Sequence, residues 1–389
     1  MRDLTSISNY IGGSNEMKVL FLTNIPSPYR VDFFNELGKL CELSVLFERR
    51  KASDRDGKWK AFKSEYFKEI FLKGIAIGND SGICPSIIRY LKDKQYDVIV
   101  IGGYSTPTGM LAIEYLRLKR IPYILNCDGG MIKNDKGLKL IIKKHFISKA
   151  SAWLSTGKKT SEYLLHYGAT KEEIYTYPFT SLKNEDIITQ IINKDEKQRL
   201  RNRLNIKEDK IIISAGQFIH RKGYDVLLNG CKNIEKSIGI YIIGGNPTEE
   251  YLQLKKNFNL KNVYFVGFKT KIELKEYYMA ADLFVLPTRE DVWGLVINEA
   301  MAYGLPVITT DKCIAGLELV KNHENGFIVP VDDEKKLADK MNIILSDDEL
   351  RGKMAQSSLY KIREYTIENM ANKHMEIFES IIDKNLYSD

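Results

Sequence analysis

Cysteine is scarce in this chain of 389 residues, and its five cysteines lie far apart. They form no C-x-x-C pair, and no histidine stands near them at the spacing of zinc ligands. This pattern excludes a zinc module and favours reduced thiols in a cytosolic protein. Long apolar runs are also missing, because no stretch of 18 or more uncharged apolar residues occurs. The sequence therefore predicts no helix that spans a membrane.

Several common nucleotide and hydrolase motifs are absent as well. No G-x-G-x-x-G follows a predicted strand, and no G-x-x-x-x-G-K-[ST] or G-x-S-x-G occurs. These absences disfavour a nicotinamide dehydrogenase, a P-loop NTPase and an α/β-hydrolase. With 44% hydrophobic and 28% charged residues, the bulk of the chain is nevertheless expected to fold as a globular protein.

Charge is distributed unevenly along the chain. Residues 1–190 hold 29 Lys and Arg against 21 Asp and Glu, whereas residues 191–389 hold 29 against 30. Much of the basic excess lies in residues 133–149, which alternate lysines with apolar residues. Such a basic amphipathic segment can sit on an anionic membrane surface or bind an acidic partner, and an ordinary solvated helix face is the alternative.

Short β-branched runs, each followed by a helical pattern, recur along the chain and predict an α/β fold with parallel sheets covered on both faces. The predicted strands are 18–23, 43–47, 97–101, 121–125, 152–155, 210–215, 238–243, 262–266, 282–286, 306–309 and 326–329. Polar and charged residues interrupt the pattern between about 182 and 209, which places a domain boundary near residue 185. We expect two Rossmann-like domains that face each other across a cleft, with ligands bound at the carboxyl ends of the strands.

The predicted domain limits follow from this pattern. Residues 1–16 are polar, lack the apolar core of a secretory signal and are expected to form a disordered tail. Residues 17–185 form the first domain and residues 186–366 the second. A last helix, about 367–389, is expected to cross back and join the first domain.

The loop and helix after strand 282–286 carry the most informative residues. The loop Thr288 to Gly294 leads into a helix expected from about Leu295, whose first backbone N–H groups can bind an anion. Asp291 in the loop and Glu299 in the helix are eight residues apart. This spacing suits two carboxylates that accept hydrogen bonds from different hydroxyls of one ligand.

A second anion-binding element is predicted after strand 210–215. Gly216 begins a loop in which Arg221 and Lys222 precede a glycine and an apolar-periodic helix. Fixed positive charge beside a helix start suits a diphosphate. An Arg-Lys-Gly turn alone is commonly a surface turn, but the carboxylates expected at the same sheet edge favour a functional interpretation.

Taken together, these motifs resemble the retaining glycosyltransferases of family 4, the group 1 glycosyltransferases with the GT-B fold. The resemblance covers about residues 200–335 and keeps the family's order of motifs. It is carried by the segments 216–228, 243–245, 262–267, 278–282, the E-x7-E region around 291–299, and 325–330.

The resemblance implies a role for each matching residue of the second domain, which becomes the nucleotide-sugar donor domain. Glu299 is expected to hold the ribose hydroxyls, and Asp291 or its neighbour Glu290 to contact the transferred sugar. Lys222, with Arg221, is expected to neutralise the diphosphate. The remaining donor-binding candidates are backbone groups or loop residues around the ligand, namely Gly216, Gly245, Phe268, Trp293, Gly294, Leu295 and Val296.

The chain departs from the family pattern at three positions. The first position of E-x7-E is Asp291, the basic residue that often precedes the K-G segment is Gln217, and Asp128 stands where many relatives have a histidine. We interpret Asp128 as a sugar-facing or acid/base residue, with a structural role in the Gly129-Gly130 turn as the alternative. The catalytic candidates are therefore Asp128, Asp291 and Lys222.

Acceptor contacts are expected from loops of the first, acceptor domain. The loop after strand 18–23 resembles the opening of capsule and O-antigen members of the family and offers Ser27, Tyr29 and Arg30. The loop after strand 97–101 offers Tyr104 and Ser105. Proline and glycine loops of this kind are commonly plain turns, which is the alternative.

The resulting hypothesis is a retaining glycosyltransferase that moves a sugar from a UDP- or GDP-sugar to a hydroxyl of a glycan or lipid-linked acceptor in bacterial surface polysaccharide biosynthesis. The resemblance implies no metal and no cofactor, because the nucleotide-sugar is a substrate. We expect a cytoplasmic protein peripherally attached to the inner face of the membrane. Two alternatives stay open: another GT-B enzyme such as a nucleotide-sugar 2-epimerase, and a non-enzymatic binder of membrane or nucleic acid. No nucleic-acid recognition motif supports the last of these.

Overall fold

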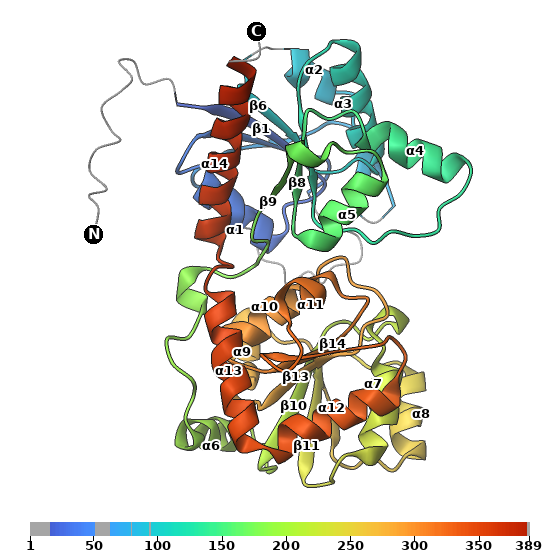
Figure 1. Ribbon diagram of the computed structural model, residues 1–389, viewed down its shortest axis with the longest axis vertical. Helices are drawn as coiled ribbons and strands as arrows, with labels where there is room; N and C mark the ends of the chain where they lie inside the picture. The colour runs from blue at the N-terminus through green and yellow to red at the C-terminus, as the bar shows by residue number, and fades with distance from the viewer. Residues whose placement is uncertain (1–15, 51–62, 79, 93–94, 387–389) are drawn as a thin grey trace. The chain divides into compact units, whose positions relative to one another are not determined.

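The computed structural model describes residues 16–50, 63–78, 80–92 and 95–386. The predicted tail therefore lies outside the described residues, except for Glu16. Two parallel sheets and one short antiparallel pair hold the strands (Figure 1). The strands are β1 (Lys18–Thr23), β2 (Glu42–Phe47), β3 (Lys68–Phe71), β4 (Ile75–Ile77), β5 (Ser81–Ile83), β6 (Val98–Ile101), β7 (Ile124–Cys127), β8 (Ala152–Ser155), β9 (Ile174–Thr176), β10 (Lys210–Ala215), β11 (Ile238–Ile243), β12 (Val263–Val266), β13 (Leu283–Leu286), β14 (Val307–Thr310) and β15 (Gly326–Val329).

Helices alternate with these strands, as the pattern predicts. They are α1 (Pro28–Leu37), α2 (Ile87–Lys92), α3 (Pro107–Leu118), α4 (Leu138–Ile147), α5 (Lys158–His166), α6 (Lys194–Arg203), α7 (Tyr224–Gly230), α8 (Glu249–Asn257), α9 (Lys271–Ala280), α10 (Leu295–Ala302), α11 (Ile314–Leu319), α12 (Glu334–Ser346), α13 (Asp348–Ile362) and α14 (Ile367–Leu386).

The chain divides into two compact units. Unit 1 comprises residues 1–126, 149–152 and 374–389, and unit 2 comprises 127–148 and 153–373. These units differ from the predicted domains, because unit 2 includes β9 and all of β8 except Ala152, although both strands belong to the first sheet. The predicted boundary near residue 185 lies inside unit 2, in the segment between β9 and β10 where the chain passes from the first sheet to the second. That boundary stays a prediction.

The second sheet has the strand order β12-β11-β10-β13-β14-β15, with parallel pairing throughout. Its central strands are continuous apolar runs, as expected for strands that are covered on both faces. Figure 1 shows α9 and α10 on one side of β10 and β11, and α7 and α8 on the other. The strand order reverses between β10 and β13, and ligands of open α/β sheets bind at such a switch point.

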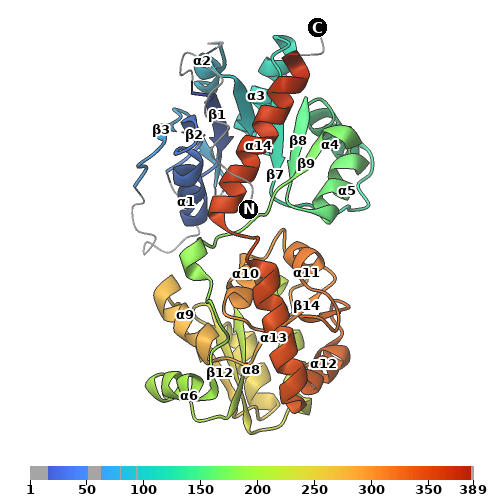
Figure 2. The same cartoon turned by 60° about the vertical axis from the view of Figure 1, so that its left-hand side comes forward.

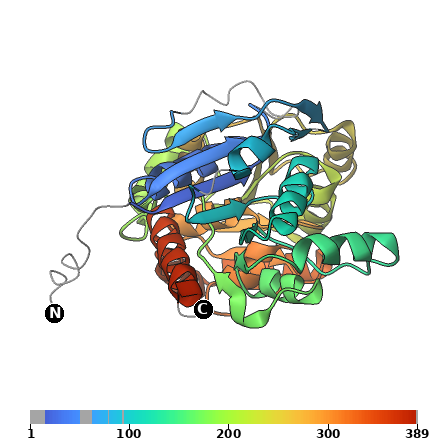
Figure 3. The ribbon, with the colours of Figure 1, turned by 90° about the horizontal axis from the view of Figure 1, so that it is seen from above.

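The first sheet follows the same plan, with the order β3-β2-β1-β6-β7-β8-β9. Its switch point lies between β1 and β6, which pair in parallel. In unit 1, Phe33 of α1 packs against His374 of α14, with ring centroids 4.7 Å apart. Figure 3 shows the blue strands of this sheet lying side by side.

The predicted strands are confirmed with small shifts at their ends. The largest shift concerns the run 121–125, because β7 spans Ile124–Cys127. Pro122 lacks the N–H that a central strand must donate, so the strand begins after it. The pattern did not predict β3, β4, β5 or β9, which are three or four residues long.

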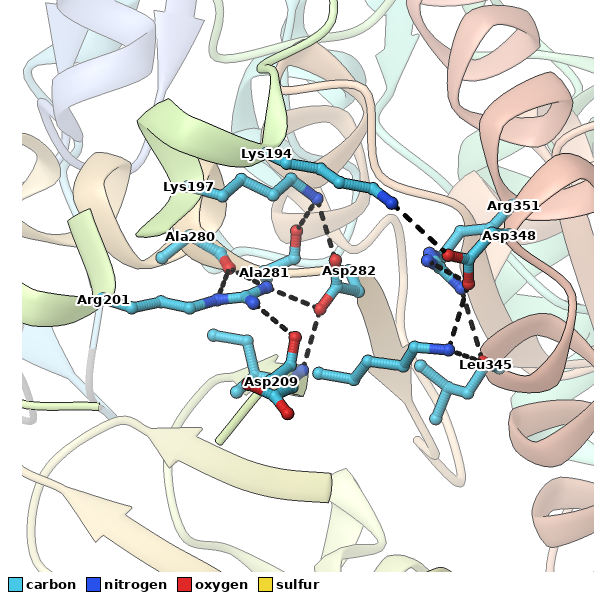
Figure 4. A network of polar contacts seen from close by, with 12 residues as sticks. Lys194, Lys197, Arg201, Asp209, Ala280, Ala281, Asp282, Leu345, Asp348 and Arg351 are labelled. Atoms are coloured by element: carbon cyan, nitrogen blue, oxygen red, sulfur yellow. Dashed lines mark hydrogen bonds and ion pairs between the residues drawn. The ribbon is translucent and has the colours of Figure 1, made fainter. Parts of the chain in front are cut away.

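A buried ion-pair network closes the amino-terminal end of β13 (Figure 4). Asp282 accepts hydrogen bonds from Arg201 at 2.7 Å, from Lys197 at 3.0 Å and from the backbone N–H of Ile211 at 2.9 Å. Arg201 and Lys197 lie on α6, which packs on α9 (Figures 1 and 2). The network therefore ties the helix that precedes the second sheet to the strands of that sheet.

Candidate active site

The loop between β13 and α10 forms the centre of the candidate site. Leu283–Leu286 is fully buried and ends at the carboxyl edge of the sheet, where the loop begins. Gly294, directly before α10, has a φ of +103°, and a Cβ at this position would lie 2.8 Å from the Sγ of Cys313. A glycine is therefore required for the loop to turn into the helix.

Lys222 and Asp291 form a short, nearly buried ion pair in this loop region. The Nζ of Lys222 lies 2.5 Å from Oδ2 of Asp291, and the two side chains are 11% and 12% exposed. Arg221 reaches the other oxygen, Oδ1, at 3.3 Å. The cations follow β10 and the carboxylate follows β13, so the pair stands at the switch point of the sheet.

The loops that carry this pair are in direct backbone contact. Gly223 has a φ of +69°, and a Cβ there would lie 2.1 Å from the carbonyl oxygen of Pro287. The backbone N–H of Arg289 donates to the carbonyl of Arg221 at 2.8 Å, and the Thr288 hydroxyl donates to the same carbonyl at 3.0 Å. The positions of Lys222 and Asp291 are thus fixed by backbone as well as by charge.

Asp291 is also held from the opposite side by the segment after β14. Its N–H donates to the carbonyl of Lys312 at 2.9 Å, and its own carbonyl accepts from Ile314 at 3.2 Å. Trp293 extends this contact, because its carbonyl accepts from the Sγ of Cys313 at 3.2 Å. The carboxylate is therefore presented by a rigid loop, which suits a residue that contacts a ligand.

Glu290 is oriented differently from Asp291. Its carboxylate accepts two hydrogen bonds from Lys133, at 2.6 and 2.8 Å, and both side chains are about half exposed. Only the backbone of Glu290 touches the cationic loop, where its carbonyl accepts from Arg221 at 2.7 Å. The sequence leaves open which of these two carboxylates contacts the transferred sugar. In the structure, Asp291 is the one that forms an ion pair with Lys222.

Arg289 braces the same loop, a role that the sequence analysis missed. Its guanidinium binds both oxygens of Asp225 at 2.8 and 2.6 Å, and its Nε lies 2.7 Å from Asp332. It also donates to the carbonyl of His220 at 2.9 Å. In the sequence, Arg289 is merely a basic residue before Glu290 and Asp291. Its partners could not be predicted, because they come from α7 and from the loop after β15.

Glu299 lies in the second turn of α10, as predicted, and its carboxylate is enclosed. The hydroxyl of Tyr278 donates to Oε2 of Glu299 at 3.1 Å, and the ring of Tyr278 stacks on Tyr303 with centroids 5.7 Å apart. Burial raises the pKa of Glu299, Asp186 acts in the same direction, and Tyr278 and Lys271 oppose the rise. Tyr278 belongs to the motif segment 278–282, but the motif alone does not indicate this contact with Glu299.

The amino-terminal turn of α10 provides the predicted backbone donors. Leu295 and Val296 are half-buried and occupy the first two helical positions, where N–H groups lack acceptors within the helix. The side chain of Trp293 is buried instead, because its Nε1 donates to Asn298 at 2.9 Å and its ring packs edge-on against Phe179. Any ligand contact of Trp293 must therefore come from its backbone.

Asp128 directly follows β7 and is half-buried. Its Oδ1 accepts a hydrogen bond from the hydroxyl of Tyr177 at 3.1 Å. The next residue, Gly129, lies against the β13–α10 loop, because a Cβ there would be 1.9 Å from the carbonyl oxygen of Val292. Asp128 thus stands beside the loop that carries Asp291, which is compatible with either role that the sequence left open.

The remaining donor candidates border the same sheet edge. Gly216 follows β10, and its backbone passes close to the hydroxyl of Tyr224. Gly245 comes two residues after β11, with a φ of +112°. Phe268 follows β12 and is 44% exposed. All three come from the loops at the carboxyl ends of strands β10, β11 and β12.

The acceptor candidates lie in unit 1, after β1 and β6. Ser27 lies in the loop after β1, but Tyr29 and Arg30 lie in the first turn of α1, because the helix begins at Pro28; Tyr104 and Ser105 lie in the loop after β6. These two strands flank the switch point of the first sheet. Ser27 and Arg30 are buried, Tyr104 is half-buried and Ser105 is exposed. Tyr29 lies beside the guanidinium of Arg30, which is 5.8 Å from its ring centroid. These assignments stay predictions.

Two further properties concern the described residues as a whole. In the part of the chain that the structure describes, no three or more His, Cys, Asp or Glu residues gather where they could hold a metal ion. None of the described helices combines the length and apolar character that crossing a membrane requires.

Comparison with known proteins identifies the class of this chain. Residues 196–359 match the family model described as glycosyl transferases group 1. The solved structure of HepE from Anabaena, in complex with UDP and glucose, covers 94% of this chain and all of its own, with a TM-score of 0.73 and 17% identity. WaaG, a glycosyltransferase involved in lipopolysaccharide biosynthesis, covers 92% and 99% with a TM-score of 0.67 and 16% identity. These structures show that the chain has the GT-B fold, and the family match shows that it is a glycosyltransferase.

More particularly, residues 196–359 match the group 1 glycosyl transferases, and this match argues against the non-enzymatic alternative. A relative from Campylobacter jejuni is 19% identical over 76% of this chain and 80% of its own length. It is named as an N,N'-diacetylbacillosaminyl-diphospho-undecaprenol alpha-1,3-N-acetylgalactosaminyltransferase. A protein of the cps region of Klebsiella pneumoniae is 24% identical over 79% of this chain and 85% of its own.

Proposed function

We propose that this enzyme transfers a sugar, with retention of configuration, from a UDP- or GDP-sugar to a hydroxyl of a glycan or lipid-linked acceptor in bacterial surface polysaccharide biosynthesis. The relative from Campylobacter supports a lipid-linked acceptor, because its name contains a diphospho-undecaprenol. The relative in the cps region of Klebsiella supports a role in capsule synthesis. We further propose that the enzyme works in the cytoplasm, at the inner face of the membrane, and needs no metal or other cofactor.

The observation that carries this proposal is the ion pair between Lys222 and Asp291 at the switch point of the second sheet. A leaving nucleoside diphosphate gains negative charge as the glycosidic bond breaks. We expect Lys222, Arg221 and the amino-terminal turn of α10 to stabilise this charge with little reorganisation, an expectation that the ion pairs of both cations with Asp291 support. Removing one such donor typically lowers the rate by about 10²–10³-fold.

The same geometry gives a role to each carboxylate of the site. When a diphosphate occupies the cations, Asp291 no longer has to neutralise them and can accept hydrogen bonds from the transferred sugar. Glu299 lies in the second turn of α10 beside Tyr278 and is proposed to accept the ribose hydroxyls. The departing phosphate is proposed to help deprotonate the acceptor hydroxyl, with Asp128 on the sugar side.

The proposal is tested by thermal unfolding of the purified protein with UDP, GDP and ADP, in the wild type and in Lys222→Ala and Glu299→Ala. A ligand at 100 times its Kd adds about 2.7 kcal/mol to the free energy of unfolding. We expect one diphosphate to stabilise the wild type and neither variant. Lys336→Ala, an exposed lysine of α12, is the matched control and should respond like the wild type.

Product analysis then distinguishes transfer from the epimerase alternative. With the stabilising nucleotide-sugar and a polyprenyl-diphosphate-linked sugar, a transferase yields a longer acceptor whose new anomeric configuration, read by NMR, matches that of the donor. Release of an epimerised free sugar without any acceptor would support the alternative. Failure of every nucleoside diphosphate to stabilise the wild type would reject the donor site.

A further inference from the structure

Helix α4 exposes its apolar side chains instead of burying them. Leu138, Ile141 and Ile142 are 72%, 63% and 39% exposed, and their spacing places them on one face of the helix. Figure 3 shows α4 (green) reaching outward beyond α5. A solvated helix of a globular protein normally turns this face toward the core, so the exposure calls for a partner.

The opposite face of α4 is the one that packs on the protein. Ile147 is fully buried, and its carbonyl accepts from the indole N–H of Trp153 at 2.8 Å. Lys143 also turns inward, where its Nζ lies 2.6 Å from Asp135 and 4.8 Å from the ring centroid of Tyr167. A lysine is thus packed inside while three aliphatic residues face outward, so the face is not an accident of a short helix.

Cations flank the exposed apolar face. At 100° per residue, Lys139 and Lys144 fall on either side of Leu138 and Ile141, and Lys136 lies just before the helix. All three lysines are exposed. The single acidic residue of the segment 131–149 is Asp135, whose side chain is only 3% exposed and is bound by Lys143 at 2.6 Å and by Lys139 at 3.0 Å. Lys139 nevertheless remains 66% exposed. The outward face therefore combines aliphatic side chains with positive charge.

We propose that this face, formed by Leu138, Ile141, Ile142, Lys136, Lys139 and Lys144, docks on an anionic lipid bilayer. Aliphatic residues between lysines suit the boundary between acyl chains and negatively charged headgroups, with each lysine strengthening binding about fivefold. A second copy of the chain fits less well, because the same lysines would oppose one another across a symmetric interface. The proposed function enters this inference at one point: docking on the bilayer would give the enzyme access to a lipid-linked acceptor.

Co-sedimentation with vesicles of phosphatidylcholine, with and without phosphatidylglycerol, tests the proposal. We expect the full chain to bind the vesicles with phosphatidylglycerol, and to lose affinity as salt is added. Replacing Lys136, Lys139 and Lys144 together by Gln should weaken binding at least about 25-fold, at about fivefold each for Lys136 and Lys144. Lys139 should add less, because Asp135 already partly neutralises it.

Replacing Leu138, Ile141 and Ile142 together by Gln should weaken vesicle binding at least about tenfold. Leu118→Gln is the control, because Leu118 ends α3 in unit 1 and is 80% exposed. Unchanged binding in both triple variants would overturn the proposal. Loss of a dimer, instead of loss of vesicle binding, in the apolar variant would show that a second copy covers the face.

The same samples separate this proposal from the proposed function. Both triple variants should keep the wild-type stabilisation by the nucleoside diphosphate, which also shows that they are folded. If the wild type responds to the nucleotide but ignores the vesicles, the docking surface is rejected and the glycosyltransferase site stands. If the wild type binds the vesicles through α4 but responds to no nucleotide, the docking surface stands and the proposed donor site is rejected.

Discussion

Near each end of strand β13, in the second sheet, a largely buried aspartate forms ion pairs with one lysine and one arginine. Asp282 precedes the strand and Asp291 follows it, and their side chains are 7% and 12% exposed. At the first end, Arg201 is 6% exposed, whereas Arg221 at the second end is 43% exposed. Two sites of the same composition therefore differ in their access to solvent.

The partners of the two pairs show what this difference means. All three nitrogens of Arg201 donate hydrogen bonds within the protein, because the side chain also donates to the carbonyls of Ala280 and Asp209 (Figure 4). At the other end, Arg221 and Lys222 stand beside the amino-terminal turn of α10, where an incoming anion can replace Asp291 as their partner. We propose that the closed pair stabilises the fold and that the open pair binds the anionic part of the ligand.

The largest effect is expected from Asp282→Asn. The substitution leaves Arg201 and Lys197 without their counter-charge, and breaking a buried pair in this way costs about 3–5 kcal/mol of the free energy of unfolding. Denaturant unfolding at neutral pH measures this loss. Turnover per folded molecule should be retained, and Asp291→Asn, the matched variant at the open end, should lose much less stability.

The loss should also depend on pH. Burial alone would raise the pKa of Asp282, but Lys197 and Arg201 outweigh it and hold this pKa below its ordinary range. The contribution of Asp282 is therefore fully present above the unfolded-state pKa of about 3.9 and is lost as the pH falls further. Unfolding curves of the variant and the wild type should converge in acid; a constant difference down to that range would contradict the assigned role.

Asp291→Asn is expected to separate binding from turnover. Because the variant removes the carboxylate that competes for Lys222, it should bind a nucleoside diphosphate several-fold more tightly. It should also lose a charge-assisted contact to the transferred sugar, worth about 1.5–3 kcal/mol, and so lower kcat/KM by about 10–100-fold. Calorimetry with UDP or GDP and initial rates measure the two effects. Weaker binding together with unchanged turnover would show that Asp291 only positions the cations.

The sequence predicted the framework of both ends of β13 but not their difference. Strands β10, β11 and β13 are uninterrupted apolar runs bounded by polar residues, so local pattern alone places them. The candidate residues of the second sheet lie after these strands at one edge, as parallel pairing predicts, and their ligand contacts stay a prediction. Asp282, in contrast, ends the motif segment 278–282, and the motif does not indicate its ion pairs with Arg201 and Lys197.

Side-chain partners were the part that the sequence could not supply. Lys133 and Glu290 are 157 residues apart, and Arg289 finds its partners on α7 and after β15. Such pairs depend on how two loops pass each other, which no residue pattern within either loop specifies. The hydrogen bond from Tyr278 to Glu299 has the same origin, since it joins α9 to α10.

The smallest effect is expected from Tyr278→Phe, which tests whether Tyr278 positions Glu299 for the donor. Without the hydroxyl, burial of Glu299 is less well compensated, so its pKa should rise further and the acid limb of the kcat/KM profile should move to higher pH. The lost hydrogen bond is worth about 0.5–1.5 kcal/mol, or about 2–10-fold in kcat/KM, and should appear in the KM for the nucleotide-sugar. Tyr303→Phe is the control, because it removes a hydroxyl from the stacked ring and keeps the bond to Glu299. A purely structural role would lower stability in both variants without moving the pH profile of either.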